Sequence, residues 1–475
     1  MFIHTFGLSV GEGYCGVGVQ GQPNEGQEAI KRNIQFAEAF IVWLKISLLS
    51  FGGPAGQIAV MHRLLVDELK WVSEKRFLHA LNFCMLLPGP EAQQLTIYLG
   101  WLLHRVRGGV VAGVLFVLPG ALTVLVLSMV YVTYQQAMAV SSIFFGVKAA
   151  VLAIVTTALW RLARKVLLKK FLIAITLSAF LASFVFAVPF PIVIVGAALA
   201  AFFFGEVPTQ TDGQDEEGDG RAIDSRIAAG GSPKPHQALF VAVVCACLWL
   251  APVAMLYGWL GASNVYVQEA MFFSQVAVVT FGGAYAVLSY MAQQTVGHFG
   301  WLSAGEMLDG LGMAETTPGP LIMVTQFVGF MGAYRSPGVL DPMVAGCLGA
   351  LVTTWVTFAP CFLWIFLGAP YIEALRGNRM LAVALTGITA AVVGVVLNLA
   401  IWFGLRVMFV DLADVTLPSL GGITLSVPVL SSFDPLASTI IAGALLAITR
   451  FGVSMIKVLT VSAATGLALG SAGLV

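Results

Sequence analysis

Long apolar stretches separated by short polar segments dominate the chain from about residue 34 onward. A helix needs about 20 mostly apolar residues to cross a hydrocarbon core of ~30 Å. Counted on that length, the pattern predicts thirteen membrane-spanning runs. They lie near residues 34–53, 82–102, 109–134, 142–160, 171–187, 189–205, 237–260, 268–288, 311–332, 343–369, 380–409, 436–449 and 452–474. We therefore expect an all-α polytopic membrane protein.

The composition supports this class. Hydrophobic residues make up 59% of the 475 residues and charged residues only 10%, whereas soluble domains carry about 25% charged residues. The six cysteines are scattered along the chain and predict neither a disulfide framework nor a metal site. The formal net charge of zero indicates no particular partner. We expect no cofactor and no nucleic acid.

The two halves of the chain repeat each other. Phe51-Gly52-Gly53 recurs 230 positions later as Phe281-Gly282-Gly283, and Pro88-Gly89-Pro90 recurs at the same displacement as Pro318-Gly319-Pro320. The sequence "GVKAAV" at 146–151 returns as "GITAAV", displaced by 241 positions. A register kept over this length indicates a fused duplication.

A polar segment rich in Gly, Asp and Glu separates the two copies and has the composition of a disordered linker. The predicted organisation is an N-terminal extension (1–33), a first repeat (34–205), a disordered cytoplasmic linker (206–236), a connecting transmembrane helix (237–260) and a second repeat (261–475).

Basic residues in the loops predict a cytoplasmic N-terminus, because short cytoplasmic loops are enriched in Lys and Arg. That orientation places the clusters at 105–107, 161–170 and 376–379 inside, with the segment 57–80 as the main exception. Seven predicted spans precede the second copy, so the second copy should enter the membrane inverted. Inverted repeats with broken helices are typical of secondary transporters.

Pro88-Gly89-Pro90 stands inside an apolar run and should break its helix. Pro90 suits the start of a new half-helix, because its missing N–H would have had no partner there. The first amides of that half-helix, those of Glu91, Ala92 and Gln93, then carry the positive end of the helix dipole and attract anions.

The second copy supplies a matching terminus at Pro320, where the amide of Leu321 lies near the Thr316 and Thr317 hydroxyls. Packing kinks are the alternative explanation for such breaks, but two breaks at matched positions favour a binding site. The predicted substrate-binding residues are Lys45, Gly52, Gly53, Pro88, Gly89, Pro90, Glu91, Ala92, Gln93, Gly282, Gly283, Thr316, Thr317, Pro318, Gly319, Pro320 and Leu321.

Ionisable residues at membrane depth are costly and often functional. Lys45 could neutralise a bound anion or could pair with Glu38, and both alternatives stay open. Glu91 and Glu315 are candidates for proton coupling, because burial favours the neutral carboxyl and lets it exchange protons near neutral pH. Glu91 could equally serve only as a helix cap. For Lys148 a structural role is preferred over a place on the transport path.

Enzyme motifs are missing from the sequence. It contains no G-x-x-x-x-G-K-[ST] phosphate loop, no H-E-x-x-H and no G-x-S-x-G. We therefore expect a transporter rather than an enzyme. A carrier of sulfate or another oxyanion is one alternative, and a passive anion channel is the other, since broken helices also build pores.

The stretches from Phe51 to Trp101 and from Phe281 to Phe330 resemble the two signature regions of the chromate ion transporter family, in its long bidomain form. Each holds an F-G-G triplet, a Trp and a P-G-P triplet in that order. The resemblance covers nearly the whole chain from about residue 34. The family's motif positions fall here on Gly52, Gly53, Pro54, Trp71, Pro88, Gly89, Pro90, Glu91, Gln93, Gly282, Gly283, Trp301, Pro318, Gly319 and Pro320.

The resemblance implies an inner-membrane carrier that exports chromate from the cytoplasm, driven by the membrane potential or a proton gradient. Sulfate, a dianion of the same shape, is then the natural competitor, and the lipid bilayer is the other expected partner. The sequence leaves open whether the chain forms a homodimer. Ala284 stands where the first copy has Pro54, which suggests that the two halves contribute unequally to the site.

Overall fold

The structure is a computed structural model that describes residues 34–51, 53–205, 235–281, 284–369, 379–417 and 423–474. Helices dominate these residues, as expected for an all-α membrane protein. The described chain departs from that class in one short antiparallel hairpin, β1 (Leu412–Leu417) with β2 (Ile423–Pro428), which the apolar pattern did not predict.

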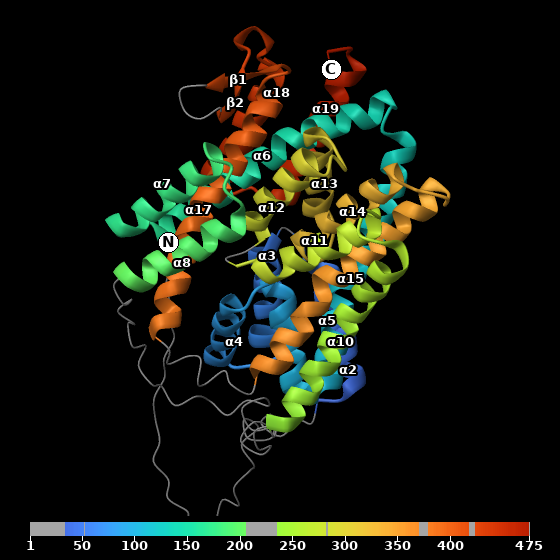
Figure 1. Cartoon of the computed structure of the whole chain (residues 1–475), viewed down its shortest axis with the longest axis vertical. Helices are drawn as coiled ribbons and strands as arrows, with labels where there is room; N and C mark the ends of the chain where they lie inside the picture. The colour runs from blue at the N-terminus through green and yellow to red at the C-terminus, as the bar shows by residue number, and fades with distance from the viewer. Residues whose placement is uncertain are drawn as a thin grey trace, which may run out of the picture.

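The first copy contains the helices α2 to α8 (Figure 1). Their bounds are α2 Phe36–Leu49, α3 Gly53–His62, the π-helix η2 Arg63–Glu68, α4 Glu74–Leu86, α5 Glu91–Tyr134, α6 Met138–Val166, α7 Lys170–Phe184 and α8 Phe190–Phe204. A single long helix, α10 (Pro235–Leu260), leads to the second copy.

The second copy follows the same order with local differences. Its elements are α11 Val265–Val279, α12 Ala284–Ala292, the π-helix η3 Gln293–His298, α13 Ala304–Thr316, the 3₁₀ turn η4 Leu321–Met323, α14 Val324–Arg335, α15 Pro342–Gly368, α17 Arg379–Met408, the β1–β2 hairpin, the 3₁₀ turn η7 Leu430–Ser432, α18 Pro435–Phe451 and α19 Met455–Ser471.

Five helices of the described chain are long and apolar enough to cross a membrane, namely α5, α6, α10 from Leu239, α15 and α17 from Ala382. Five shorter apolar helices, α7, α8, α11, α18 and α19, add to them. The runs at 82–102 and 311–332 are divided at the P-G-P motifs, as predicted. The runs at 34–53 and 268–288 differ from the prediction, because their helices end before the F-G-G motifs.

The boundary predicted near residues 102–109 is a tight reversal of the chain. Element α5 (Glu91–Tyr134) consists of two helices that join at His104 and Arg105, whose dihedrals are non-helical. The two helices pack against each other, since a Cβ added to Gly113 would lie 2.5 Å from Ile97 Cγ1. Arg105 takes the left-handed side of the Ramachandran plot with φ 54. The corresponding place in the second copy is an open connection between α14 and α15.

Fine details of the backbone recur at the predicted displacement of 230 positions. The π-helices η2 and η3 each end on an i to i−5 bond, from Leu69 N to Leu64 O and from Phe299 N to Gln294 O. Ser73 and Ser303 cap the helices that follow. These details agree with a duplicated chain, while the inverted orientation of the second copy remains a prediction.

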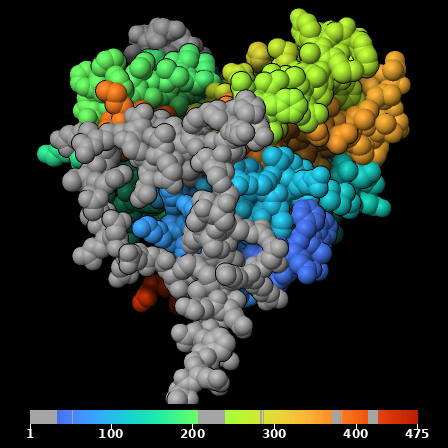
Figure 2. All heavy atoms as spheres, turned by 90° about the horizontal axis from the view of Figure 1, so that it is seen from below, coloured from blue at the N-terminus to red at the C-terminus, as the bar shows by residue number. Residues whose placement is uncertain are grey.

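The two helical hairpins that precede the P-G-P turns lie toward opposite ends of the molecule. Figure 1 shows α4 in the lower half and α13 in the upper half, with α3 and α12 near the middle. From below, the green residues of α7 and α8 and the yellow-green residues of α10 lie along one edge of the molecule, and blue and cyan residues of the first copy lie beside them (Figure 2).

Candidate functional site

The two P-G-P turns are hydrogen-bonded to the opposite copy. The Gly89 amide donates to the Thr280 carbonyl at 2.8 Å, and the Gly319 amide donates to the Ser50 carbonyl at 2.9 Å. Thr280 and Ser50 are the last residues before the F-G-G motifs. The bonds are themselves related by the 230-residue displacement, so they bring the beginnings of both F-G-G motifs and both P-G-P turns into one region.

Buried amide side chains complete the two turns. Gln94 Nε2 donates to the Pro88 carbonyl at 2.6 Å, and Gln57 Nε2 donates to the Gly319 carbonyl at the same distance. Gly89 and Gly319 both have positive φ, 123° and 98°, which glycine adopts without strain. Sequence reasoning missed Gln57 and Gln94, although isolated polar residues in apolar runs could have indicated them.

The half-helices that start at the two turns differ in chemistry. Helix α5 begins with Glu91, Ala92 and Gln93 after the N-cap Pro90. Gln93 is fully buried, and neither its amide nitrogen nor its oxygen has a hydrogen-bond partner among the described residues. In the second copy Leu321, Ile322 and Met323 form a buried 3₁₀ turn after Pro320.

Glu315 lies in the buried centre. Its side chain is 2% exposed, and Oε1 accepts a hydrogen bond of 2.7 Å from the Tyr285 hydroxyl. A Cβ added to Gly53 would lie 4.0 Å from the other carboxyl oxygen, so the motifs of both copies meet at this side chain. The hydroxyls of Thr316 and Thr317 donate to carbonyls of their own helix α13 rather than across the turn.

A large cavity reaches the first residue of α5, Glu91. It has a volume of about 1540 Å³ and lies between α3, α4, α7, α8 and the facing parts of α6 and α17. Its ionisable lining residues are His62, Arg63, Asp67, Glu91, Lys165, Lys169 and Lys170. Cations therefore outnumber acids around this space.

Two of the cationic lining groups have acidic partners. Arg63 pairs with Glu68 at 3.5 Å, and His62 lies against Asp67 and Glu74. Lys165, at the end of α6, lines the same cavity as Glu91. The predicted residue Glu91 is half-buried at the cavity wall.

Lys45 is not part of this arrangement. It lies on the exposed face of α2, and its counterpart Gln275 is exposed on α11. The role of counter-charge remains a prediction that this placement does not support. Gly52, Gly282 and Gly283 lie outside the described residues.

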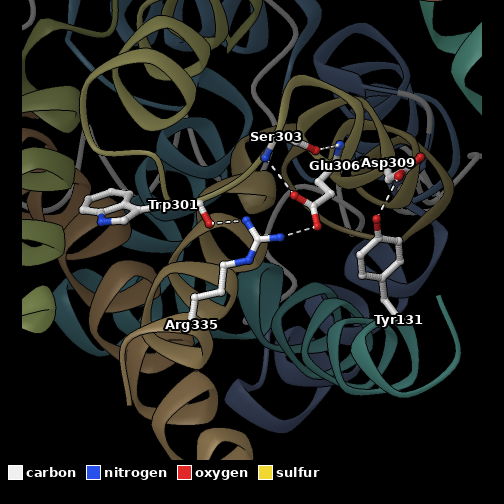
Figure 3. A network of polar contacts seen from close by, with 6 residues as sticks. All are labelled: Tyr131, Trp301, Ser303, Glu306, Asp309 and Arg335. Atoms are coloured by element: carbon white, nitrogen blue, oxygen red, sulfur yellow. Dashed lines mark hydrogen bonds and ion pairs between the residues drawn. The ribbon is translucent and has the colours of Figure 1, made fainter. Parts of the chain in front are cut away.

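Lys148, for which a structural role was preferred, forms an ion pair with Asp309 at 3.3 Å. Asp309 also accepts a hydrogen bond of 2.9 Å from the Tyr131 hydroxyl, which points toward it in Figure 3. The sequence analysis did not single out Asp309 or Tyr131. An acid in the apolar approach to the second P-G-P turn was the available signal.

Comparisons with known proteins agree with the motifs. The family model described as "Chromate transporter" matches residues 37–202 and 267–467. The chain is 30% identical over 408 residues to the chromate transport protein of Pseudomonas aeruginosa, covering 85% of this chain and 88% of that protein. It is 30% identical over 363 residues to the probable chromate transport protein of Synechococcus elongatus, covering 76% and 83%. It is 28% identical over 427 residues to the chromate transport protein of Cupriavidus metallidurans, covering 85% and 90%. No solved structure matches the chain.

Proposed function

The chain belongs to the chromate transporter family, and from this premise we propose that it is a secondary transporter that exports chromate from the cytoplasm. Its relatives carry names that refer to chromate transport, and its own helices are those of a multi-pass membrane protein. Export, its energy source and the residues that bind the anion are parts of the proposal.

The observation that carries the proposal is the cavity that ends at the start of α5. The first backbone amides of a helix lack partners within it and carry partial positive charge. Lys165, Lys169 and Lys170 line the same cavity as this terminus. A tetrahedral dianion that enters the space would meet cations first and hydrogen-bond donors at its end.

Glu91 is the group we propose for proton coupling. The carboxylate and a substrate dianion would both be attracted to Lys165, and an ionised Glu91 would repel the dianion. Protonation of Glu91 would therefore favour anion binding, and deprotonation would favour release. Glu315, buried beside Gly53 and bonded to Tyr285, is the second candidate.

The basic residues around the cavity support the proposed direction of transport. Lys165, Lys169 and Lys170 form the largest basic cluster around the cavity, and such clusters favour the cytoplasmic side. We therefore propose that this cavity opens to the cytoplasm, that the N-terminus is cytoplasmic and that the protein lies in the inner membrane.

The test is uptake of labelled chromate into inverted membrane vesicles, with and without a protonophore and with excess sulfate. Energy-dependent uptake that persists in sulfate is the expected result. Uptake abolished by sulfate would reassign the substrate to sulfate, and uptake that never exceeds the electrochemical equilibrium of chromate would indicate an anion channel. Empty-vector vesicles serve as the control for leak.

A further inference from the structure

Corresponding hairpins of the two copies differ sharply in exposure. Leu78 of α4 is 46% exposed at the cavity wall, whereas its counterpart Leu308 of α13 is 1% exposed. Met85 is 41% exposed, and its counterpart Glu315 is 2% exposed. The first copy thus has an open space where the second copy has packed protein.

Helix α6 fills the space beside α13. A Cβ added to Gly312 would lie 2.2 Å from Val147 Cγ1, so the missing side chain lets the two helices touch. The counterpart of Gly312 is Asn82, which is exposed on α4. The counterpart of α6 is α17, which faces α4 across the cavity and contributes Thr389 to its wall.

An ion pair holds this closed side together. Lys148 stands at the position of Thr389, displaced by 241 residues, and reaches Asp309 of α13 at 3.3 Å. The Asp309 side chain is 5% exposed, and its second oxygen accepts the bond from Tyr131 of α5. In the open copy these positions hold Thr389 and His79, and a threonine cannot form an ion pair.

The N-terminal end of α13 is fastened separately. Arg335 of α14 donates to the Trp301 carbonyl at 2.8 Å and to the Glu306 carboxylate at 2.6 Å. Glu306 also accepts a hydrogen bond from the Ser303 amide, which completes a capping box at the start of α13 (Figure 3). These contacts would keep the start of α13 on α14 while the rest of the helix leaves α6. Opening would then require separation of Lys148 from Asp309.

We propose that Lys148, Asp309 and Tyr131 form a latch that closes a second anion pathway between α13 and α6, and that Lys148 binds the oxyanion when this pathway is open. The inference rests on the proposed function of anion transport. In the closed state Asp309 compensates the charge of Lys148, and in the open state the anion does so. Lys148, whose side chain is 30% exposed in the closed state, therefore has a counter-charge in both states, which lowers the cost of a cation at membrane depth.

Accessibility of matched cysteine substitutions tests the latch. Leu308→Cys reports on the closed side and Leu78→Cys on the open side, each labelled with a membrane-impermeant maleimide in sided vesicles. The protein with its native cysteines alone gives the background. We expect Leu78→Cys to react from the cytoplasmic face and Leu308→Cys to remain protected.

Breaking the latch should make the cysteine at position 308 accessible. Lys148→Gln or Asp309→Asn should increase labelling of Leu308→Cys from the opposite face by about tenfold, a typical coupling for two sites. The charge exchange Lys148→Asp with Asp309→Lys should restore protection, which a merely misfolded variant would not show. Labelling of Leu308→Cys that stays unchanged in both single variants overturns the latch.

The anion-binding role of Lys148 needs a second comparison. Asp309→Asn opens the latch and keeps the lysine, whereas the double variant with Lys148→Gln opens it and removes the lysine. We expect the KM for chromate to be about tenfold higher in the double variant than in Asp309→Asn. Equal KM values overturn this role. The labelling needs no chromate, so absence of chromate transport with a normal labelling pattern would refute the proposed substrate and leave the latch standing.

Discussion

The same backbone turn introduces two half-helices with opposite surroundings. At the first P-G-P turn, α5 begins with Glu91 and Gln93 at the end of a basic cavity. At the second, Leu321, Ile322 and Met323 begin the half-helix in a fully packed interior. The shared geometry comes from proline and glycine, which fix the backbone whatever the neighbours are. The side chains that follow are free to differ, so a duplication can keep its architecture while its two halves take different tasks.

Removal of either turn should have the largest effect. Replacing Pro88-Gly89-Pro90 or Pro318-Gly319-Pro320 by three alanines should abolish chromate transport, because a continuous helix has no free amides at that point. The amount of protein in the membrane, followed by immunoblotting, separates lost function from lost insertion. Normal transport in either variant would contradict the site assignment.

Substitutions at the first residues of the two half-helices should give the next largest effect, and this effect should differ between the two copies. Glu91→Gln should reduce proton-dependent transport about 100-fold, within the range for loss of a proton-transferring group, and should make the remaining flux insensitive to a protonophore. Leu321→Met, at the matched position, conserves volume and should change transport less than twofold, roughly. Equal losses in both variants would show that the halves are not specialised.

Substitution of a basic residue that lines the cavity should give a smaller difference between the two copies in the KM for chromate. Lys165→Gln should raise the KM for chromate by about tenfold, while Lys165→Arg should retain most of the affinity because the charge is kept. The matched residue in the second copy is Arg406, which lies over the Trp402 ring at 4.1 Å. Arg406→Gln should change KM by no more than about twofold, since Arg406 is not among the residues that line the cavity.

Lys45 should give the smallest effect. Its side chain is exposed on α2, so Lys45→Gln should leave the KM for chromate within about twofold of the wild-type value. Gln275→Ala, on the corresponding exposed face of α11, is the control. A loss of transport specific to Lys45→Gln would restore the counter-charge role that its position does not support.

The motifs that sequence reasoning found are those in which the backbone itself is constrained. Pro88-Gly89-Pro90 and its repeat could be predicted as helix breaks, because ring closure and the missing amide act locally. The divided runs at 34–53 and 268–288 were counted as single spans, since a count of apolar residues does not register where the helix ends.

Contacts between distant segments could not be predicted in this way. The cavity depends on which helix packs beside each hairpin, and Leu78 and Leu308 are the same residue type in similar apolar surroundings. The pairing of Lys148 with Asp309 joins residues 161 positions apart, and no local pattern relates them. The difference between the two copies lies in the burial of matched residues, which the sequence does not show.

The hydrogen bond from Gly89 to Thr280 also bears on how the protein is made. Its acceptor lies 191 residues after its donor, so at a synthesis rate of about 5–20 residues per second the first turn waits roughly 10–40 s for its partner. During that interval the Gly89 amide of the nascent first half lacks its acceptor, the Thr280 carbonyl. Pulse-labelled chains treated with protease should therefore be cleaved near Gly89 until the second half has been translated. The period of greatest exposure to quality-control proteases is thus set by the length of the chain between Gly89 and Thr280, and not by the stability of the finished protein.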